Sequence, residues 1–236
     1  MKRELLDALL ADRAAKKPVV LATTLGTGEQ WLICANGCTP GAPDDVIAAA
    51  RAALAADKSQ TVEGPDGPVF LQVHNPPLRM IVVGAVHIAQ ALAPMAALAG
   101  YQVTVVDPRG AFATQDRFPG VDVTDDWPDE AMETLAPDSR TAVVTLTHDP
   151  KLDDPALEVA LKSDAFYVGS LGSKKTHLAR TKRLARLGID ADAIALIHGP
   201  AGLPIGAKSP AEIAVAILAQ VIETRRRAPA AEDRAA

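Results

Sequence analysis

The sequence predicts an α/β protein in which a Rossmann-like parallel sheet follows a small, abbreviated α/β module at the N-terminus. The stretch from Arg79 to Asp107 contains, in order, an apolar run, a glycine, a helical pattern and a second apolar run. Just before it, Pro76 and Pro77 forbid both a helix and a central strand. Apolar runs and helical patterns keep alternating after these prolines. We therefore expect two domains, residues 1–77 and 78–236.

The composition excludes several classes of protein. The chain has 236 residues, of which 48% are hydrophobic, so one large core or two modest ones can form. A net charge of −5 argues against nucleic-acid binding, and an aromatic content of 3% argues against stacking on single strands. No apolar run approaches the ~20 residues that span a membrane. Residues 1–18 mix charges into their apolar positions, as an amphipathic helix does and a signal peptide does not. A cytoplasmic protein is expected, without nucleic-acid or membrane partners.

The N-terminal module is predicted to alternate helices with short strands. Leucines at helical spacing indicate a first helix, and Pro18 ends that segment. Asp44 and Asp45 precede an alanine-rich helix, where the helix dipole favours carboxylates. The remaining apolar runs are short and flanked by turn residues, which is typical of strands. The predicted strands are Val19–Thr24, Trp31–Cys34, Thr61–Val62 and Val69–Val73, with a helix at Val46–Ala56 and an irregular loop at 36–41.

The second domain begins with a strand, a turn, a helix and a second strand. Met80–Val83 is rich in β-branched residues, which suits a buried parallel strand, and Gln102–Val106 is similar. The phosphate-binding fingerprint of such a unit is G-x-G-x-x-G/A, and the turn here is GAVHIA, starting at Gly84. Val86 replaces the middle glycine, so a dinucleotide in the usual pose would meet a branched side chain. The pattern supports the fold strongly and NAD binding weakly.

The rest of the domain continues the alternation. A loop from Pro108 to Pro119 carries Arg109, Asp116 and Arg117. The last helix has a capping box, with Ser209 as the cap and Glu212 three residues later. The predicted elements are strands at 121–123, 142–147 and 166–168, and helices at 129–135, from Asp153, Asp154 and Pro155 to about 163, at 174–186 and from 210 to about 226.

Ligands of such sheets bind outside the carboxyl ends of the strands, where Gly84, Asp107, His148 and Gly169 fall. Asp107 can accept hydrogen bonds from ribose hydroxyls, and it can equally cap the turn before Pro108. His148 and Asp149 can form a ligand clamp, and an Asp–Pro turn with a solvated histidine is an equal alternative.

A second candidate site is the stretch from Gly169 to Thr176, which joins a strand to a basic helix. Ser173 can cap this helix, and Lys174 and Lys175 occupy its first turn. Lysine is unfavourable there because that end of the helix dipole is already positive, and a bound phosphate would relieve the conflict. The lysines can also simply extend into water; we favour the phosphate. The loop lacks the Walker A spacing.

Cys34 and Cys38, the two cysteines of the chain, are too few for a disulfide framework and a poor pair for zinc. Cys34 lies in an apolar strand and is expected to be a buried, structural thiol. Cys38 lies in a loop of turn-forming residues and is expected to be accessible. Such a thiol can bind a soft metal such as molybdenum or carry sulfur, or be an idle surface cysteine.

Two long segments carry a family resemblance. THDPKLDDPALEVALKSDAFYVGSLGSKKTHLARTKRL and IHGPAGLPIGAKSPAEIAVAILAQVI closely resemble the C-terminal domain of the XdhC/CoxI family of xanthine dehydrogenase accessory proteins. GAVHIAQALAPMAALAGYQVTVVDPR fits the same domain, where the family usually has G-A-G-H. The resemblance covers about Leu78 to Arg226. The segment Asn36-Gly37-Cys38 is similar to the family's G-G-C segment, whereas Gly28 to Pro77 is shorter than its counterpart.

The resemblance implies a function as a molybdenum-cofactor (molybdopterin) binding and insertion protein, a chaperone more than a catalyst. It implies as partner a molybdenum hydroxylase apoenzyme such as xanthine dehydrogenase, with a cysteine desulfurase and a homodimer as further candidates. Cys38 would approach the metal, and the remaining expected cofactor-binding residues are Gly84, His87, Asp107, His148, Asp149, Gly169, Ser170, Gly172, Ser173, Lys174 and Lys175. The alternative is an NAD(P)-dependent oxidoreductase, against which stand Val86 and the absence of an obvious catalytic Tyr–Lys pair.

Overall fold

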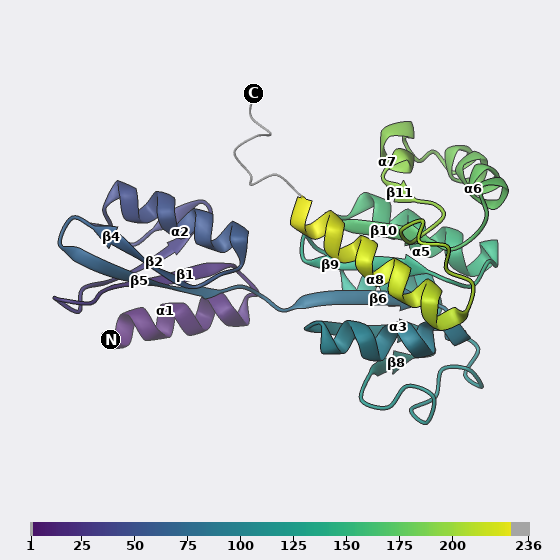
Figure 1. Cartoon of the computed structure of the whole chain (residues 1–236), viewed down its shortest axis with the longest axis horizontal. Helices are drawn as coiled ribbons and strands as arrows, with labels where there is room; N and C mark the ends of the chain where they lie inside the picture. The colour runs from purple at the N-terminus through teal and green to yellow at the C-terminus, as the bar shows by residue number, and fades with distance from the viewer. Residues whose placement is uncertain (1, 228–236) are drawn as a thin grey trace. The chain divides into compact units, whose positions relative to one another are not determined.

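The computed structural model describes residues 2–227 and divides the chain into two compact units (Figure 1). The first unit ends at Pro76 and the second begins at Pro77, at the pair of prolines. The predicted second domain runs to residue 236, and its residues 228–236 lie outside the described part of the chain. No helix within residues 2–227 combines the length and the apolar character needed to cross a membrane.

The first unit is an antiparallel sheet between two helices. Its strand order is β3-β2-β1-β5-β4. One helix, α1, packs its Leu9 against the sheet, and the other, α2, packs alanines and Val46 against residues that alternate with those under α1. The elements are α1 (Arg3–Ala14), β1 (Val19–Thr24), β2 (Gln30–Cys34), β3 (Gly37–Cys38), α2 (Asp44–Ala56), β4 (Gln60–Gly64) and β5 (Gly67–His74).

Two local predictions for this unit were wrong. Cys38 was expected in an irregular loop, but Gly37 and Cys38 form β3, which pairs with the end of β2 because the turn at 35–36 reverses the chain tightly. The second helix starts at Asp44 and not at Val46, since Pro43 is its N-cap residue and both acidic residues belong to its first turn.

The second unit is a six-stranded parallel sheet in the order β11-β10-β9-β6-β7-β8, which is the Rossmann order 3-2-1-4-5-6 from the other edge. The predicted α/β fold class is thereby confirmed. The elements are β6 (Leu78–Val83), α3 (His87–Leu98), β7 (Tyr101–Val106), β8 (Asp122–Thr124), α4 (Pro128–Leu135), β9 (Thr141–Thr145), α5 (Pro150–Lys162), β10 (Tyr167–Ser170), α6 (Lys174–Arg186), α7 (Ala191–Ala195), β11 (Ile197–His198) and α8 (Pro210–Arg227).

Helices cover both faces of this sheet. Alternate strand residues such as Val82 pack with α3 and α8, and their neighbours such as Ile81 pack with α4, α5 and α6. Both faces are apolar because each is buried under helices, as parallel sheets require. The predicted capping box of α8 is present, since Glu212 N donates to Ser209 Oγ (3.3 Å) and Ser209 N donates to Glu212 Oε2 (2.9 Å).

The expected start of α5 was wrong. Asp153, Asp154 and Pro155 were expected to open this helix, but it begins at Pro150, with Asp149 as its N-cap. Asp149 Oδ1 accepts a hydrogen bond from Lys151 N (2.9 Å), which supplies the capping signal one turn earlier. Proline is well tolerated at the first helical position, so the Asp–Pro pair itself is the start signal.

Candidate functional site

The site lies where the strand order reverses, between the adjacent strands β6 and β9. Gly84 follows β6 with a φ of +112°, a conformation that side chains with a Cβ rarely adopt. A Cβ at this position would lie 2.6 Å from Thr147 Cγ2 and 3.2 Å from Thr147 N. The turn after β6 therefore packs directly on the segment after β9, and glycine is needed for that approach.

Asp107 fixes the geometry of this turn from the end of β7. Its side chain is fully buried, and its Oδ2 accepts hydrogen bonds from Ala85 N (2.7 Å) and Arg109 Nη2 (2.7 Å). Oδ1 accepts from Arg109 N (3.0 Å) and Arg109 Nε (2.8 Å). Burial by itself would raise the pKa of Asp107, but the hydrogen bonds from Arg109 and Ala85 lower it below its ordinary value.

Of the two interpretations of Asp107, the structure therefore matches the capping one. Both carboxylate oxygens are engaged within the chain, so Asp107 orients the turn and Arg109.

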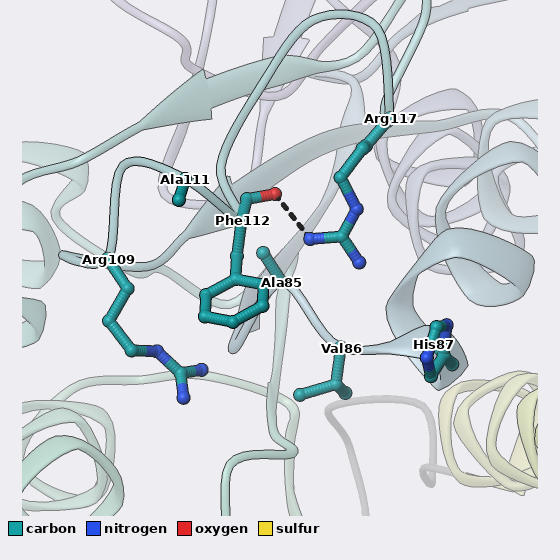
Figure 2. A pocket seen from close by; sticks show the side chains of 7 residues that line it. All are labelled: Ala85, Val86, His87, Arg109, Ala111, Phe112 and Arg117. Carbon is teal, nitrogen blue, oxygen red and sulfur yellow. Dashed lines mark hydrogen bonds between the residues drawn. The ribbon is translucent and has the colours of Figure 1, made fainter.

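A cavity of about 460 Å³ opens beside the turn (Figure 2). The ring of Phe112 lies between two guanidinium groups, with Arg109 Cζ 4.9 Å and Arg117 Cζ 5.5 Å from its centroid. Arg117 Nη1 also donates to the Phe112 carbonyl (2.7 Å), which holds the loop closed. None of the lining residues is acidic; they are Ala85, Val86, His87, Arg109, Ala111, Phe112 and Arg117.

The N-terminus of α3 faces the same cavity. Its N-cap residue is Val86, whose side chain makes no capping hydrogen bond, and His87 is the first helical residue. The first N–H groups of this helix therefore point out without a side-chain partner, at the positive end of its dipole. His87 is exposed, and its Nδ1 is 3.1 Å from Gln90 Oε1. An uncapped helix start and two arginines suit an anion.

Arg109 and Arg117 stood out in the sequence only as charges in a loop, and Phe112 was missed. The signal available was the density of arginine and aromatic residues within a few positions after a strand-ending aspartate. No periodicity accompanies it, so the pattern alone does not show that the three side chains converge.

His148 and Asp149 follow β9 at the same edge. The structure has the Asp–Pro turn and not a clamp: Asp149 caps α5, and His148 is exposed with a φ of +63°. Asp153, on α5, holds this turn. Its Oδ1 accepts a hydrogen bond from Thr147 Oγ1 (2.6 Å), and its Oδ2 accepts one from His148 N (3.1 Å). The His148 ring is thus presented to solvent beside the Gly84 turn.

The expected phosphate loop after β10 is shorter than predicted. Gly169 and Ser170 belong to β10 and are buried, and the Ser170 hydroxyl hydrogen-bonds to Thr145 Oγ1. A Cβ at Gly169 would fall within 2.5 Å of the Tyr167 hydroxyl, so this glycine serves packing. Both residues are therefore removed from the set of direct ligand contacts, because the sheet continues two residues further than the apolar run.

What remains of that loop is a capped helix start. Gly172 has a φ of +141°, and Ser173 Oγ accepts from Thr176 N (3.1 Å) as the cap of α6. Lys174 and Lys175 are exposed in the first turn. Because β6 and β10 both pair with β9, the two turns are separated by two strand spacings, about 10 Å.

A buried ion pair connects the segments after β9 and β10. Arg180, on α6, is 1% exposed; its Nη2 donates to the Leu171 carbonyl (2.8 Å) and lies 4.0 Å from Asp153 Oδ2. Burial raises the pKa of Asp153, against the hydrogen bond from Thr147 and the charge of Arg180. The pair therefore sets the positions of the neighbouring segments after β9 and β10 from inside the domain.

The two cysteines lie in the first unit. Cys38 is exposed on β3. Cys34 was expected to be buried but is only half-buried, because α1 covers the end of β2 on one side only. On that side, Cys34 Sγ lies 3.9 Å from Asp12 Oδ2 of α1. Burial raises the pKa of Cys34, and the charge of Asp12 raises it further. Within residues 2–227, no group of three or more His, Cys, Asp or Glu side chains is placed to hold a metal ion.

Comparison with known proteins gives consistent matches. A protein-family model described as the XdhC Rossmann domain matches residues 80–221. The chain is 33% identical over 160 residues to a probable xanthine dehydrogenase subunit of Bacillus subtilis, covering 67% of this chain and 46% of that protein. It is 31% identical over 151 residues to the molybdenum cofactor insertion chaperone PaoD of Escherichia coli, covering 64% and 41%.

A solved structure, described as a xanthine dehydrogenase from Bacillus halodurans, matches with a TM-score of 0.70 and 26% identity, over 97% of this chain and 66% of that one. The chain spans less than half the length of the curated relatives that it matches.

Proposed function

The chain belongs to the XdhC family, and from this premise we propose that it binds the molybdenum cofactor and delivers it to a molybdenum hydroxylase apoenzyme. The single observation that carries the proposal is the cavity at the uncapped N-terminus of α3, which combines two arginines with an aromatic ring. The molybdenum cofactor is a pterin with a phosphate group and a sulfur-bound metal. An anion site beside a flat apolar surface fits the first two of these features.

The phosphate would be bound by the first N–H groups of α3 and by Arg117. Arg109 is already paired with Asp107, so its charge is largely balanced, whereas Arg117 contacts a carbonyl oxygen and keeps its full charge. Phe112 is 46% exposed, so the exposed edge of its ring can contact a planar ring system beside the two guanidinium groups. His87 and His148 would line the same edge of the sheet.

Lys174 and Lys175 would add positive charge two strand spacings away, at the start of α6. Their contribution is through charge, because Ser173 already caps that helix. In the first unit, Cys38 would bind the metal as a thiolate, since it is exposed and sulfur is a suitable ligand for a soft metal. The bound group supplies the metal and the pterin; the chain binds, orients and shields it.

The partners follow from the same proposal. A molybdenum hydroxylase would receive the cofactor, a cysteine desulfurase is a candidate for the supply of sulfur, and delivery would take place in the cytoplasm.

The alternative, an NAD(P)-dependent oxidoreductase, is disfavoured by two residues. Val86 stands where a pyrophosphate needs a glycine, and Asp107 has no oxygen left for a ribose.

Calorimetric titration of the purified chain with molybdenum cofactor, NAD and NADP tests the proposal. We expect binding of the cofactor and none of the nicotinamide nucleotides. Replacing Arg117 by alanine should weaken cofactor binding about ten- to a hundredfold, the value of one charge-assisted contact. Arg51→Ala, an exposed arginine on α2, is the matched control and should change nothing. Tight nicotinamide binding without cofactor binding would refute the function.

A further inference from the structure

Four residues other than glycine have a positive φ within residues 2–227: Lys16, Asp57, Ala136 and His148. Three of them follow the last turn of α1, α2 or α4, where a left-handed residue commonly ends a helix. His148 is different, because it lies between β9 and Asp149, the N-cap of α5, with a φ of +63°. No helix ends there, so helix termination does not account for its conformation.

The contacts of the His148 side chain do not account for it either. A left-handed conformation is unfavourable for a residue with a Cβ, whereas glycine adopts it freely. The imidazole of His148 is exposed and makes no hydrogen bond to any other group within residues 2–227. Glycine would therefore fit this turn with less strain, and the fold gains no hydrogen bond from the ring. Strain of this kind, at the carboxyl edge of a parallel sheet, points to a role of the side chain in binding.

Asp153, in the first turn of α5, holds the backbone around this histidine in place. Its Oδ2 accepts a hydrogen bond from His148 N (3.1 Å), and its Oδ1 accepts one from Thr147 Oγ1 (2.6 Å). The same Thr147 hydroxyl accepts a hydrogen bond from Asp149 N (3.0 Å). The backbone on both sides of the imidazole is therefore tied to one carboxylate. Asp153 is 1% exposed and lies beside the buried Arg180, so its own position is fixed.

This segment lies beside the cavity of Figure 2, which is lined by the two residues after Gly84. A Cβ on Gly84 would lie 2.6 Å from Thr147 Cγ2, so the turn after β6 is in direct contact with the residue before the histidine. Arg109 also lines the cavity. The hydrogen bond with Asp107 has the largest effect in raising the pKa of Arg109, and the charge of Asp149 raises it further, so this segment also lies close to the guanidinium. The imidazole is therefore held next to the cavity.

We propose that His148 donates a hydrogen bond from its imidazole to the ligand in this cavity, and that Asp153 is the positioning residue that aims the imidazole. The inference rests on the proposed function and adds to it a contact from the end of β9. The acceptor would be an oxygen or nitrogen of the pterin or an oxygen of its phosphate. Asp153 does not touch the ligand, because it is buried and both its oxygens accept hydrogen bonds within the chain. The strain at His148 preorganises the contact before the ligand arrives.

Calorimetry of the full chain with molybdenum cofactor, together with thermal melting, tests the contact. His148→Gly removes the imidazole and the strain, so affinity should fall about threefold to tenfold, the value of one ordinary hydrogen bond. The melting temperature should change little, because relief of strain offsets the greater freedom of glycine in the unfolded chain. His148→Asn tolerates the left-handed conformation and keeps a hydrogen-bonding side chain, so it should retain more affinity than the glycine variant. Ala136→Gly, at another positive φ outside the site, is the matched control and should leave affinity unchanged.

A double-mutant cycle tests the positioning role. Asp153→Asn leaves one acceptor oxygen in place of two and should weaken binding in the parent, but little further in the His148→Gly background, where no imidazole remains to be aimed. Thr147→Val, which keeps the methyl group against Gly84, replaces it if that variant is not folded.

Equal losses of affinity in the two backgrounds would overturn the role of Asp153. Unchanged affinity of His148→Gly beside a parent that binds would overturn the contact and leave the proposed function standing, whereas a parent that does not bind the cofactor would overturn both.

Discussion

Asp107→Asn is the substitution that tests most directly how the candidate site is held together. The native carboxylate is fully buried and accepts hydrogen bonds from Ala85 N and from three groups of Arg109. Asparagine has nearly the same shape but one acceptor oxygen and an N–H₂ group, which cannot accept. Whichever way the amide is oriented, a donor of the turn or of Arg109 faces another donor.

The expected loss of stability follows from these contacts. Leaving the buried Ala85 N–H unsatisfied costs about 1–3 kcal/mol. The Arg109 side chain is 43% exposed, so the loss of its ion pair is screened by solvent and adds about 1 kcal/mol at most. We therefore expect the free energy of unfolding to fall by about 1–4 kcal/mol at neutral pH. Loss of the solvent-exposed salt bridge alone would lower the free energy of unfolding by about 1 kcal/mol at most.

The same substitution has a characteristic pH dependence. Hydrogen bonds lower the pKa of Asp107 in the folded state below the unfolded value of about 3.9. A carboxyl group with a lowered folded pKa stabilises the protein above the unfolded pKa, and this stabilisation is lost as the pH falls through the folded pKa. The difference between parent and variant should therefore be largest near neutral pH and should shrink below about pH 4.

Urea denaturation of both proteins from about pH 7 to about pH 3 measures this difference. Asp66→Asn, in an exposed turn of the first unit, is the matched control and should change stability by less than about 0.5 kcal/mol. A loss of less than about 1 kcal/mol for Asp107→Asn, or a difference that does not change with pH, would refute the assignment of Asp107 as the group that orients the turn.

Three further outcomes are expected. Gly84→Ala should destabilise the protein by about 2–4 kcal/mol in thermal or urea unfolding, because of its positive φ and the crowded approach of the segment after β9; a neutral effect would contradict that packing. Replacing Lys174 and Lys175 together by alanine should weaken cofactor binding in calorimetry with an unchanged melting temperature, and unchanged affinity would make that loop purely structural. Alkylation followed by mass spectrometry should label Cys38 before Cys34, and Cys38→Ala should retain less cofactor, whereas full retention would remove Cys38 from the site.

Much of the fold could be predicted because its signals are local and periodic. Met80–Val83 and Gln102–Val106 are apolar runs of strand length, and the residues between them repeat at helical spacing up to Gly100. Such patterns show whether one or both faces of a helix or strand are buried, and a few consecutive residues are enough to reveal it. The handedness of parallel connections restricts the possible strand orders, but the order itself, and with it the point where it reverses, came from the structure.

The start of α5 and the end of β10 could not be placed in the same way. Asp149-Pro150 and Asp153-Asp154-Pro155 both resemble helix starts. Asp153 cannot be the exposed N-cap because it is buried beside Arg180, so the helix starts at the earlier pair. That arginine is 27 residues further along the chain. Ser170 similarly belongs to the sheet because Thr145 offers a hydroxyl to pair with. Contacts between distant segments decided both boundaries.

The cavity was the least predictable part of the site, and its structure bears on what it can hold. In a dinucleotide site, glycines let the pyrophosphate approach the helix, and an acidic residue at the end of the second strand binds the ribose. Here Val86 stands where the fingerprint's middle glycine would let a pyrophosphate lie close against the turn, and the oxygens of Asp107 are occupied by Arg109 and Ala85. Both features act against a dinucleotide: Val86 hinders the close approach of a pyrophosphate, and the contacts of Asp107 with Arg109 remove the ribose contact. The uncapped helix and Arg117 are kept, so the site still favours an anion while it no longer has the features that select NAD.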